Sequence, residues 1–301
     1  MDNMALAGVI VPVITPVDDE DRVEEATFRR ILRRLIGSGV HALFVGGSAG
    51  EGPLLVPSEW QRMVEIAYDE VNGKLPLLGG VMDTSTRRVK EKINALAHIG
   101  FKYFVLTPSY YYTLQSPGEH LRLFSECAES AQGMDMIVYN IPSAVNSQIP
   151  IEVIVELTRR GVTKYCKESS ADFAYFQRLM AEATPLGLKV FMGEEPNIAA
   201  GLLGGASGIV PVCANLEPKT FVRAYEAGLR KDQAELATLQ ERILLVRSHL
   251  PKLAPCWIAG VKYSVAALGL GSGKPVSPLQ PLTAEEKQKL EALVRASASY
   301  Q

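Results

Sequence analysis

The sequence is poor in the residues that build metal cages and disulfide frameworks. Its four cysteines are far apart and include no CxxC pair, which argues against a disulfide framework or a zinc cage. Its four histidines show no ligand spacing, so a histidine metal site or a Ser-His-Asp triad has little support. These residues are Cys127, Cys166, Cys213, Cys256, His41, His98, His120 and His249. We therefore expect no metal and no organic cofactor.

An excess of charge and a long hydrophobic run are also missing. The formal net charge is −2, so the composition does not indicate a nucleic acid or an anionic membrane as partner. No apolar run reaches the length of a transmembrane helix. The N-terminus lacks the basic start of a signal peptide, and prolines at 12 and 16 interrupt the apolar run from Ala5 to Val17. These absences predict a cytoplasmic protein.

Eight short apolar segments recur along the chain. They are rich in Val, Ile and Leu and lack the alternation of a half-exposed strand, which favours a parallel sheet covered on both faces. The predicted strands are residues 9–15, 42–46, 75–81, 103–107, 136–140, 162–166, 189–192 and 208–212.

Amphipathic segments separate the predicted strands. Several begin with a proline, which is favoured in the first turn of a helix. The predicted helices are residues 24–37, one opening at Pro57, 84–99, one starting near Ser116, 150–160, 173–183, 196–203 and 218–229.

Eight strand–helix units in series predict an α/β fold, the (β/α)8 or TIM barrel, since each parallel strand needs a crossover helix. A doubly wound sheet would favour a glycine-rich turn after the first strand, and residues 15–19 contain no glycine. Three more helical segments follow, at residues 233–248, 254–268 and 283–297. We therefore expect a catalytic barrel over residues 1–229 and a C-terminal helical extension over residues 230–301 that packs on it.

Lys167 stands where the sixth predicted strand runs into polar residues. A lysine is rare at the inner end of a core strand, because removing an ammonium from water costs several kcal/mol. Burial disfavours the charged form and leaves a free amine, the nucleophile of Schiff-base enzymes. A lone strand-end lysine more often extends its amine to the surface. The other strand ends decide between these interpretations.

The site of such a barrel lies at the carboxyl ends of its strands. After the second strand the chain reads Gly46-Gly47-Ser48-Ala49-Gly50-Glu51-Gly52, whose open backbone amides and Ser48 hydroxyl suit a carboxylate. Tyr139 ends the strand next to that of Lys167. A phenol beside an amine can relay protons while a carbinolamine forms, loses water and undergoes carbon–carbon cleavage.

These residues predict covalent catalysis on a 2-oxo acid. The cradle at Gly47 and Ser48 would hold the substrate carboxylate and place its carbonyl near Lys167. The resulting iminium ion is an electron sink, so C3 can lose a proton or an aldehyde. This chemistry needs neither metal nor organic cofactor.

Three motifs resemble the signatures of the dihydrodipicolinate synthase / N-acetylneuraminate lyase superfamily. They are Gly47-Ser48-Ala49-Gly50-Glu51, Tyr139-Asn140-Ile141-Pro142 and Lys167-Glu168-Ser169. Their order and spacing are those of the family, and the likeness covers nearly the whole chain. The resemblance implies a class I aldolase barrel that is usually a homotetramer, built as a dimer of dimers.

The resemblance also implies roles for single residues. Lys167 matches the Schiff-base lysine, and Tyr139 matches the proton relay. Ser48 matches a hydroxyl residue that binds the carboxylate and links to the tyrosine, and Tyr110 matches a tyrosine inserted into the neighbouring subunit's site. Two further positions match residues whose backbone lines the pocket, Gly193 and Val210.

Departures from the family pattern bear on the substrate. Family synthases of lysine biosynthesis carry an arginine where this chain has Ala144, and two adjacent threonines where it has Ser48 and Ala49. Neither alanine can donate a side-chain hydrogen bond to a substrate. Sialic-acid lyases read sugar hydroxyls with an Asp-Glu pair, whose places are taken here by Glu195 and Pro196. A shorter hydroxylated 2-oxo acid fits this combination.

The leading hypothesis is a lyase that cleaves a 2-keto-3-deoxy sugar acid, or a related compound, to pyruvate and an aldehyde. A dehydratase or deaminase that uses the same lysine imine remains open, and so does a synthase-like condensation of pyruvate with an aldehyde. A barrel that only binds a small acid is disfavoured, because a pure binder gains little from a desolvated lysine beside Tyr139 and Ser48.

Overall fold

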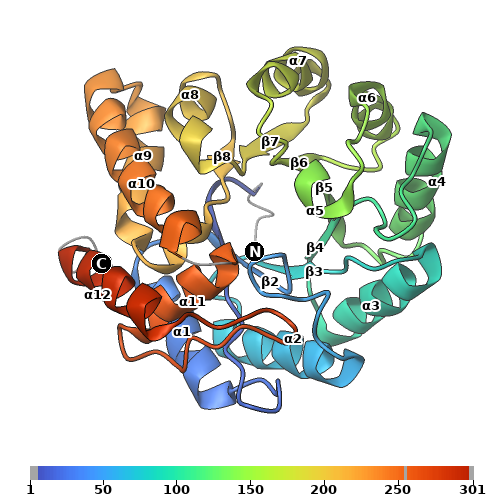
Figure 1. Ribbon diagram of the computed structural model, residues 1–301. Helices are drawn as coiled ribbons and strands as arrows, with labels where there is room; N and C mark the ends of the chain where they lie inside the picture. The colour runs from blue at the N-terminus through green and yellow to red at the C-terminus, as the bar shows by residue number, and fades with distance from the viewer. Residues whose placement is uncertain (1–5, 254–255, 298–301) are drawn as a thin grey trace.

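The computed structural model describes residues 6–253 and 256–297, and its centre is a closed barrel of parallel strands (Figure 1). Each strand pairs with its neighbour in chain order, and β8 pairs with β1 to close the ring. The predicted (β/α)8 barrel is confirmed. The strands are β1 (Gly8–Pro12), β2 (Ala42–Val45), β3 (Leu77–Gly80), β4 (Tyr103–Leu106), β5 (Asp135–Asn140), β6 (Tyr165–Glu168), β7 (Lys189–Met192) and β8 (Gly208–Ile209).

The predicted crossover helices form a ring around this sheet (Figure 1). A short helix after β5, α5 (Pro142–Val145), and three 3₁₀ turns were not predicted, and two of these turns are η2 (Glu195–Asn197) and η3 (Val212–Asn215). The ring helices are α1 (Glu25–Gly37), α2 (Pro57–Val71), α3 (Thr86–Ile99), α4 (Pro117–Ala128), α6 (Ile151–Arg159), α7 (Phe173–Ala183), α8 (Ile198–Leu203) and α9 (Pro218–Arg230).

The last part of the chain is helical, as expected. It contains α10 (Gln233–Leu253), α11 (Trp257–Ala266) and α12 (Ala284–Ala296). Helix α10 packs on α9 and on η2 at the rim of the barrel, and α11 packs on η3. Residues 1–5, 254–255 and 298–301, which include the start predicted for the second of these helices, lie outside the described residues.

In three strands one boundary differs from the predicted one by three residues. The sixth strand was predicted over residues 162–166 but lies at Tyr165–Glu168, so Lys167 is inside the strand. Lys167 and Glu168 both pair with residues of β5, and a barrel strand can carry polar side chains where they face a cavity or a hydrogen-bond partner. Strands β1 and β8 end earlier than predicted, at Pro12 and Ile209.

Alternation along the strands divides the core into two layers. Ile10, Phe44 and Phe191 belong to the cluster inside the barrel, whereas Val9 and Val11 belong to the cluster between sheet and helices. The inner layer fills the barrel beneath its carboxyl rim. Residues on the same strand face but nearer the carboxyl ends, among them Lys167, therefore point into the space above this apolar layer.

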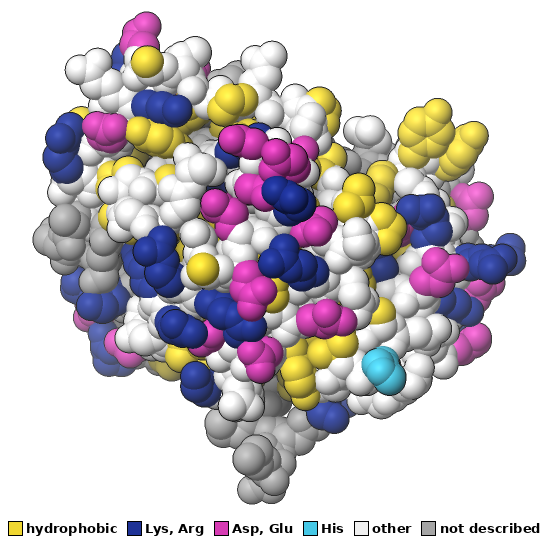
Figure 2. Space-filling view, turned by 90° about the horizontal axis from the view of Figure 1, so that it is seen from below, with side chains coloured by type: hydrophobic (Ala, Val, Ile, Leu, Met, Phe, Trp, Pro, Cys, Tyr) yellow, Lys and Arg dark blue, Asp and Glu magenta, His cyan; other side chains and the backbone are white. Residues whose placement is uncertain are grey.

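The surface carries both signs of charge in a mixed pattern. Figure 2 shows basic and acidic side chains intermingled over one face of the molecule. Among residues 6–253 and 256–297, none of the helices combines the length and apolarity that a membrane crossing requires. Three of the cysteines are buried free thiols and Cys256 is half-buried.

A buried carboxylate joins the first two crossover helices. Glu70 of α2 accepts hydrogen bonds from Arg33 Nε at 2.8 Å and from Arg29 Nη1 at 3.3 Å, both on α1. The hydrogen bond from Arg33 is the main reason that the pKa of Glu70 lies below its usual range. The contribution of Glu70 to stability is therefore present above the ordinary carboxyl pKa and is lost as the pH falls through its lowered value in the folded protein.

Glu70→Gln is expected to lower the midpoint of thermal unfolding at pH 7 by roughly 2–4 °C, because the amide keeps the shape but loses the charge. The difference from wild type should shrink as unfolding is repeated at more acidic pH. Glu65→Gln, on the exposed face of the same helix, is the control and should change the midpoint little. A deficit that is equally large at acidic pH would contradict the electrostatic explanation.

Candidate active site

A cavity of about 170 Å³ opens at the carboxyl ends of the strands. Its walls combine residues from β1, β5 and β6, from the segments that follow β2, β5, β6, β7 and β8, and from the C-terminal helices. Predicted site residues in this lining are Ser48, Ala49, Tyr139, Lys167, Gly193, Glu195 and Val210. The strand ends that carry them are held by the backbone ladder, in which Ser169 N donates to Asn140 O and Gly193 N donates to Glu168 O.

Lys167 occupies the floor of the cavity and is 7% exposed. Its strand partner in the barrel ladder is Tyr139. The Lys167 Nζ atom lies 4.0 Å from the centre of the Tyr139 ring and 5.5 Å from that of Phe44. The amine thus rests on aromatic faces, which attract a cation without taking its proton.

The residues next to these two point to the opposite face. Asn140 Nδ2 donates to Glu168 Oε1 at 3.1 Å, and the same oxygen accepts from Ser170 N at 2.7 Å. Burial raises the pKa of Glu168 above its usual range. Asn140 and Glu168 therefore hold the ends of β5 and β6 from behind, while Tyr139 and Lys167 face the cavity.

The turn after β2 is a compact loop whose backbone closes on itself. Gly52 N donates to Gly47 O and Glu51 N donates to Ser48 O, each at 3.2 Å. A Cβ atom on Gly52 would lie 2.1 Å from Gly46 O, so only glycine fits there. Ser48 and Ala49 reach the cavity, whereas Gly47 packs over the Phe44 ring below it and is not part of the lining.

Two adjacent acids follow β7. Glu195 is 3% exposed, and its Oε1 accepts from Cys213 N at 2.7 Å while its Oε2 pairs with Arg247 Nε at 3.1 Å. Glu194 also lines the cavity, and within the described part of the chain no hydrogen bond engages its carboxylate. Burial raises the pKa of both acids. Glu194 therefore offers the freer oxygens to a bound molecule.

Eight lining residues were not among the predicted site residues: Pro12, Ile141, Ser143, Ser169, Glu194, Val212, Arg247 and Trp257. Ser169 belongs to the motif that contains Lys167 but had no predicted role, and among the described residues its buried Oγ has no hydrogen-bond partner. Arg247 and Trp257 come from α10 and α11, far in sequence from the strand ends at which the site was predicted. Only their position in the folded chain identifies them.

Tyr110 is not part of the cavity lining. It is half-buried against the cluster inside the barrel, and burial raises its pKa. The next two tyrosines, Tyr111 and Tyr112, are 85% and 77% exposed and pack edge to face with each other. The role of Tyr110 in a neighbouring subunit stays a prediction.

No metal-binding cluster of three or more His, Cys, Asp or Glu side chains is found within residues 6–253 and 256–297. The cavity instead gathers one amine, one guanidinium, two carboxylic acids, a phenol and several hydroxyls. This set can bind a carboxylate, hold hydroxyl groups and transfer protons.

The family model that describes the dihydrodipicolinate synthetase family matches residues 5–297. The chain belongs to this family. Among curated relatives, an uncharacterized DapA-like lyase of Halobacterium salinarum is 32% identical over 293 residues, covering 97% of this chain and 94% of that one. The 4-hydroxy-tetrahydrodipicolinate synthase of Methanopyrus kandleri is 30% identical over 292 residues, covering 95% of this chain and 94% of that one.

Solved structures of the dihydrodipicolinate synthetase family agree with the observed fold. Dihydrodipicolinate synthase from Bacteroides thetaiotaomicron superposes with a TM-score of 0.92 at 26% identity, covering 98% of this chain and 99% of that one. CdNal of Clostridium difficile, solved in complex with mannosamine, superposes with a TM-score of 0.91 at 21% identity, covering 99% of this chain and 100% of that one. At that identity the likeness concerns the fold alone.

Gly193 is the tightest glycine of the site. A Cβ atom there would lie 1.9 Å from Ser169 Oγ, 2.9 Å from Glu168 O and 3.1 Å from Lys167 Cε. Gly193→Ala is therefore expected to lower the free energy of unfolding by about 1–3 kcal/mol, since the backbone of β6 must shift. Denaturant unfolding would measure this effect.

Gly118→Ala is the matched control for Gly193→Ala. Gly118 lies in the first turn of α4, where the nearest atom to an added Cβ is 3.9 Å away. It should leave stability unchanged or slightly raised, because alanine favours the helix. Equal stability of the two variants would show that the strand ends around Lys167 tolerate an extra methyl group.

Proposed function

We propose that this protein is a Schiff-base lyase that cleaves a hydroxylated 2-oxo acid, of the 2-keto-3-deoxy sugar acid type, to pyruvate and an aldehyde. Family membership makes the chain a lyase of the carbon–carbon or carbon–oxygen type. The observation that supports covalent catalysis is the environment of Lys167, a buried amine that faces a cavity.

A second buried lysine provides a comparison within the same chain. Lys262 is also buried, but its amine pairs with the Glu51 carboxylate at 2.5 Å, so it has a structural partner. Among the described residues no carboxylate lies within ion-pair distance of Lys167, whose nearest ring is that of Tyr139. A buried lysine that no carboxylate holds in an ion pair keeps its amine free to approach a substrate carbonyl.

In the proposed reaction the substrate carboxylate lies in the turn around Ser48, and Lys167 Nζ adds to the substrate C2. With one added proton, the carbonyl oxygen leaves as water and an iminium ion forms. The C3–C4 bond then breaks, its electrons move toward the iminium, and the C4 hydroxyl becomes an aldehyde. The hydroxyl proton is relayed through the Tyr139 hydroxyl to C3, and one water molecule then releases pyruvate, the free amine and the proton taken up when the iminium formed.

The polar groups of the cavity support a hydroxylated substrate. Ser169, Ser143 and Glu194 line it beyond the lysine and can exchange hydrogen bonds with hydroxyls. Ala144 occupies the position of the family arginine, and it is exposed and outside the cavity lining. This position therefore provides no contact to a second carboxylate of the substrate.

A condensation of pyruvate with an aldehyde is the second candidate, because several relatives are named 4-hydroxy-tetrahydrodipicolinate synthase. Dehydration or deamination through the same imine is the third. Product analysis separates these reactions. Cleavage releases pyruvate, condensation consumes pyruvate and lengthens the carbon skeleton, and dehydration or deamination leaves the carbon skeleton intact. From the resemblance we also propose a homotetramer in which Tyr110 reaches a neighbouring site.

The first test is to incubate the protein with pyruvate and borohydride and to map the modified peptide by mass spectrometry. We expect a reduced adduct on Lys167 in the wild type and none in Lys167→Ala, because the nucleophile is gone. Lys164→Ala is the control, since Lys164 is exposed and ion-paired with Asp135. An adduct of equal yield in Lys167→Ala would disprove the assignment.

Tyr139→Phe keeps the ring under the amine but removes the hydroxyl. We expect turnover of the best cleaved 2-oxo acid to fall by roughly 10²–10⁴, the usual range for a proton-transfer group. Far-UV circular dichroism should be unchanged, since the side chain has lost one atom. An unchanged rate would assign the proton relay to another residue.

Ser169→Ala removes a buried hydroxyl that has no protein partner. The free protein should lose no stability, because no hydrogen bond is broken. The KM for a hydroxylated 2-oxo acid should rise roughly 5- to 30-fold, while trapping of pyruvate stays close to wild type. Unchanged KM values for every cleaved substrate would show that Ser169 does not contact the substrate.

A further inference from the structure

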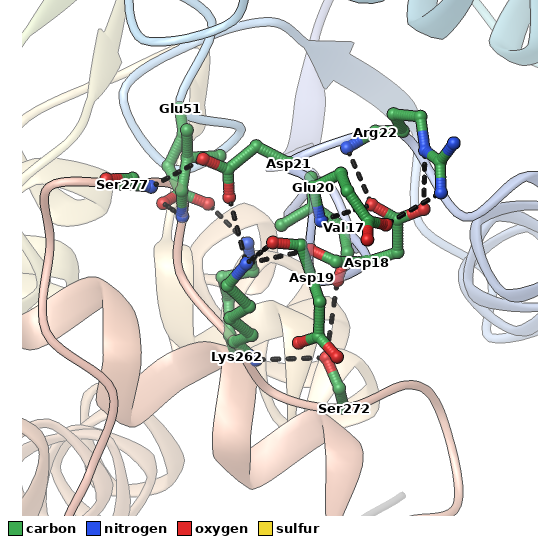
Figure 3. Close-up of polar contacts among 12 residues, drawn as sticks. Val17, Asp18, Asp19, Glu20, Asp21, Arg22, Glu51, Lys262, Ser272 and Ser277 are labelled. Atoms are coloured by element: carbon green, nitrogen blue, oxygen red, sulfur yellow. Dashed lines mark hydrogen bonds and ion pairs between the residues drawn. The ribbon is translucent and has the colours of Figure 1, made fainter.

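The buried ion pair of Glu51 and Lys262 joins two parts of the chain that are far apart in sequence (Figure 3). Both side chains are 1% exposed, and Lys262 Nζ lies 2.5 Å from Glu51 Oε2. Glu51 belongs to the turn after β2 that carries Ser48, and Lys262 belongs to α11. The other carboxylate oxygen, Glu51 Oε1, accepts from Val276 N at 2.7 Å. Both oxygens of Glu51 are thus held by the C-terminal extension.

Glu51 faces away from the cavity, although it was grouped with the predicted cradle. It is not part of the lining, whereas Ser48 and Ala49 of the same turn are. Its backbone is left-handed, with φ of 53°, and its N–H donates to Ser48 O. A left-handed residue other than glycine costs about 1–2 kcal/mol, so its surroundings must hold it in place.

The extension also holds a second loop of the barrel. Lys274 Nζ donates to the backbone oxygens of Asp18 and Asp19, each at 2.9 Å, and pairs with Asp21 at 3.2 Å. Ser277 N donates to Asp21 Oδ2 at 3.2 Å. Figure 3 shows Asp21 and Ser277 of these contacts beside Glu51. Residues after α11 therefore fix both the turn after β1 and the turn after β2.

Stability alone does not explain a fully buried ion pair. Removing two charges from water costs as much as their attraction returns, and apolar residues of similar volume often stabilise a protein equally well. What the pair supplies is a fixed geometry, since a carboxylate with two charge-assisted or backbone donors has one position. That position sets the end of the loop that presents Ser48.

We propose that Glu51 and Lys262 are positioning residues that hold the carboxylate cradle in its binding geometry, so that affinity for the 2-oxo acid depends on the docking of α11. This inference rests on the proposed function for its ligand. The C-terminal extension then has two roles at the site: it positions the carboxylate cradle, and it contributes Arg247 and Trp257 to the cavity wall.

The test uses the full-length double variant Glu51→Gln/Lys262→Met. Glutamine keeps the acceptor for Val276 N, and the two changes together leave no unpaired buried charge. The pyruvate concentration that gives half-maximal borohydride trapping should rise roughly 10- to 100-fold, since small misplacement of a binding group has effects of this size. The trapping rate at saturating pyruvate should change less than about threefold, because Lys167 and Tyr139 are untouched.

Glu217→Gln/Arg242→Met is the matched control. The Glu217 carboxylate is also buried, while Arg242 is 13% exposed, and the pair also joins the barrel to the extension, at the start of α9 and on α10. Neither residue belongs to the cavity lining. A general loosening of the extension would affect both double variants, whereas a positioning role affects only the first. If the first double variant fails to fold, Glu51→Gln alone replaces it, since burial lowers the pKa of Lys262 and the amine can become neutral.

Hydrogen exchange of the amides at residues 47–52 gives a readout that does not depend on catalysis. We expect faster exchange there in the Glu51 variant than in wild type or in the Glu217 control. If the wild type forms the adduct, the inference is overturned by either of two results in the Glu51 variant. One is unchanged amide exchange at residues 47–52, and the other is an unchanged pyruvate concentration for half-maximal trapping. A wild type that traps no 2-oxo acid refutes the proposed function instead, and exchange at residues 47–52 then decides the positioning role by itself.

Discussion

An amine kept out of water without a counter-ion is the constraint on which the rest of this structure depends. Burying a lysine is unfavourable unless its charge is paired or given up, and a paired lysine is a poor nucleophile. Here the side chain of Lys167 lies above an apolar floor and against the ring of Tyr139. Three nearby acids are engaged elsewhere, Glu168 with Asn140, Glu195 with Arg247 and Glu51 with Lys262, and Glu194 lines the cavity without an ion pair to Lys167 among the described residues.

The barrel meets this constraint through the two-residue period of its strands. Each strand end presents one residue to the cavity and the next to the helices, so a motif of neighbouring residues divides into two functions. Tyr139 and Lys167 face inward as ladder partners, while Asn140 and Glu168 hydrogen-bond on the outer side. The inward pair is thereby positioned by backbone hydrogen bonds, and the outward pair keeps the two strand ends together.

The extension after α9 completes a site that the strands alone leave open. Helices α10 and α11 supply Arg247 and Trp257 to the wall, and the residues that follow hold the turns after β1 and β2. The predicted division into a barrel over residues 1–229 and an extension over residues 230–301 follows the order of elements along the chain and stays a prediction. The site itself uses both parts, because a short turn such as that around Ser48 needs external contacts to hold one conformation.

The sequence by itself determined the order of the eight strand–helix units, since their hydrophobic periodicity is local and repeats along the chain. It also indicated the strand-end motifs around Ser48, Tyr139 and Lys167, because a barrel places such positions at one rim. The tertiary structure decided the rest: that β6 extends through Glu168, that Ser169 Oγ lacks a partner, and that Glu51 pairs with a lysine 211 residues away. Contacts between distant segments depend on how helices pack around the closed sheet, and no local pattern of residues contains that information.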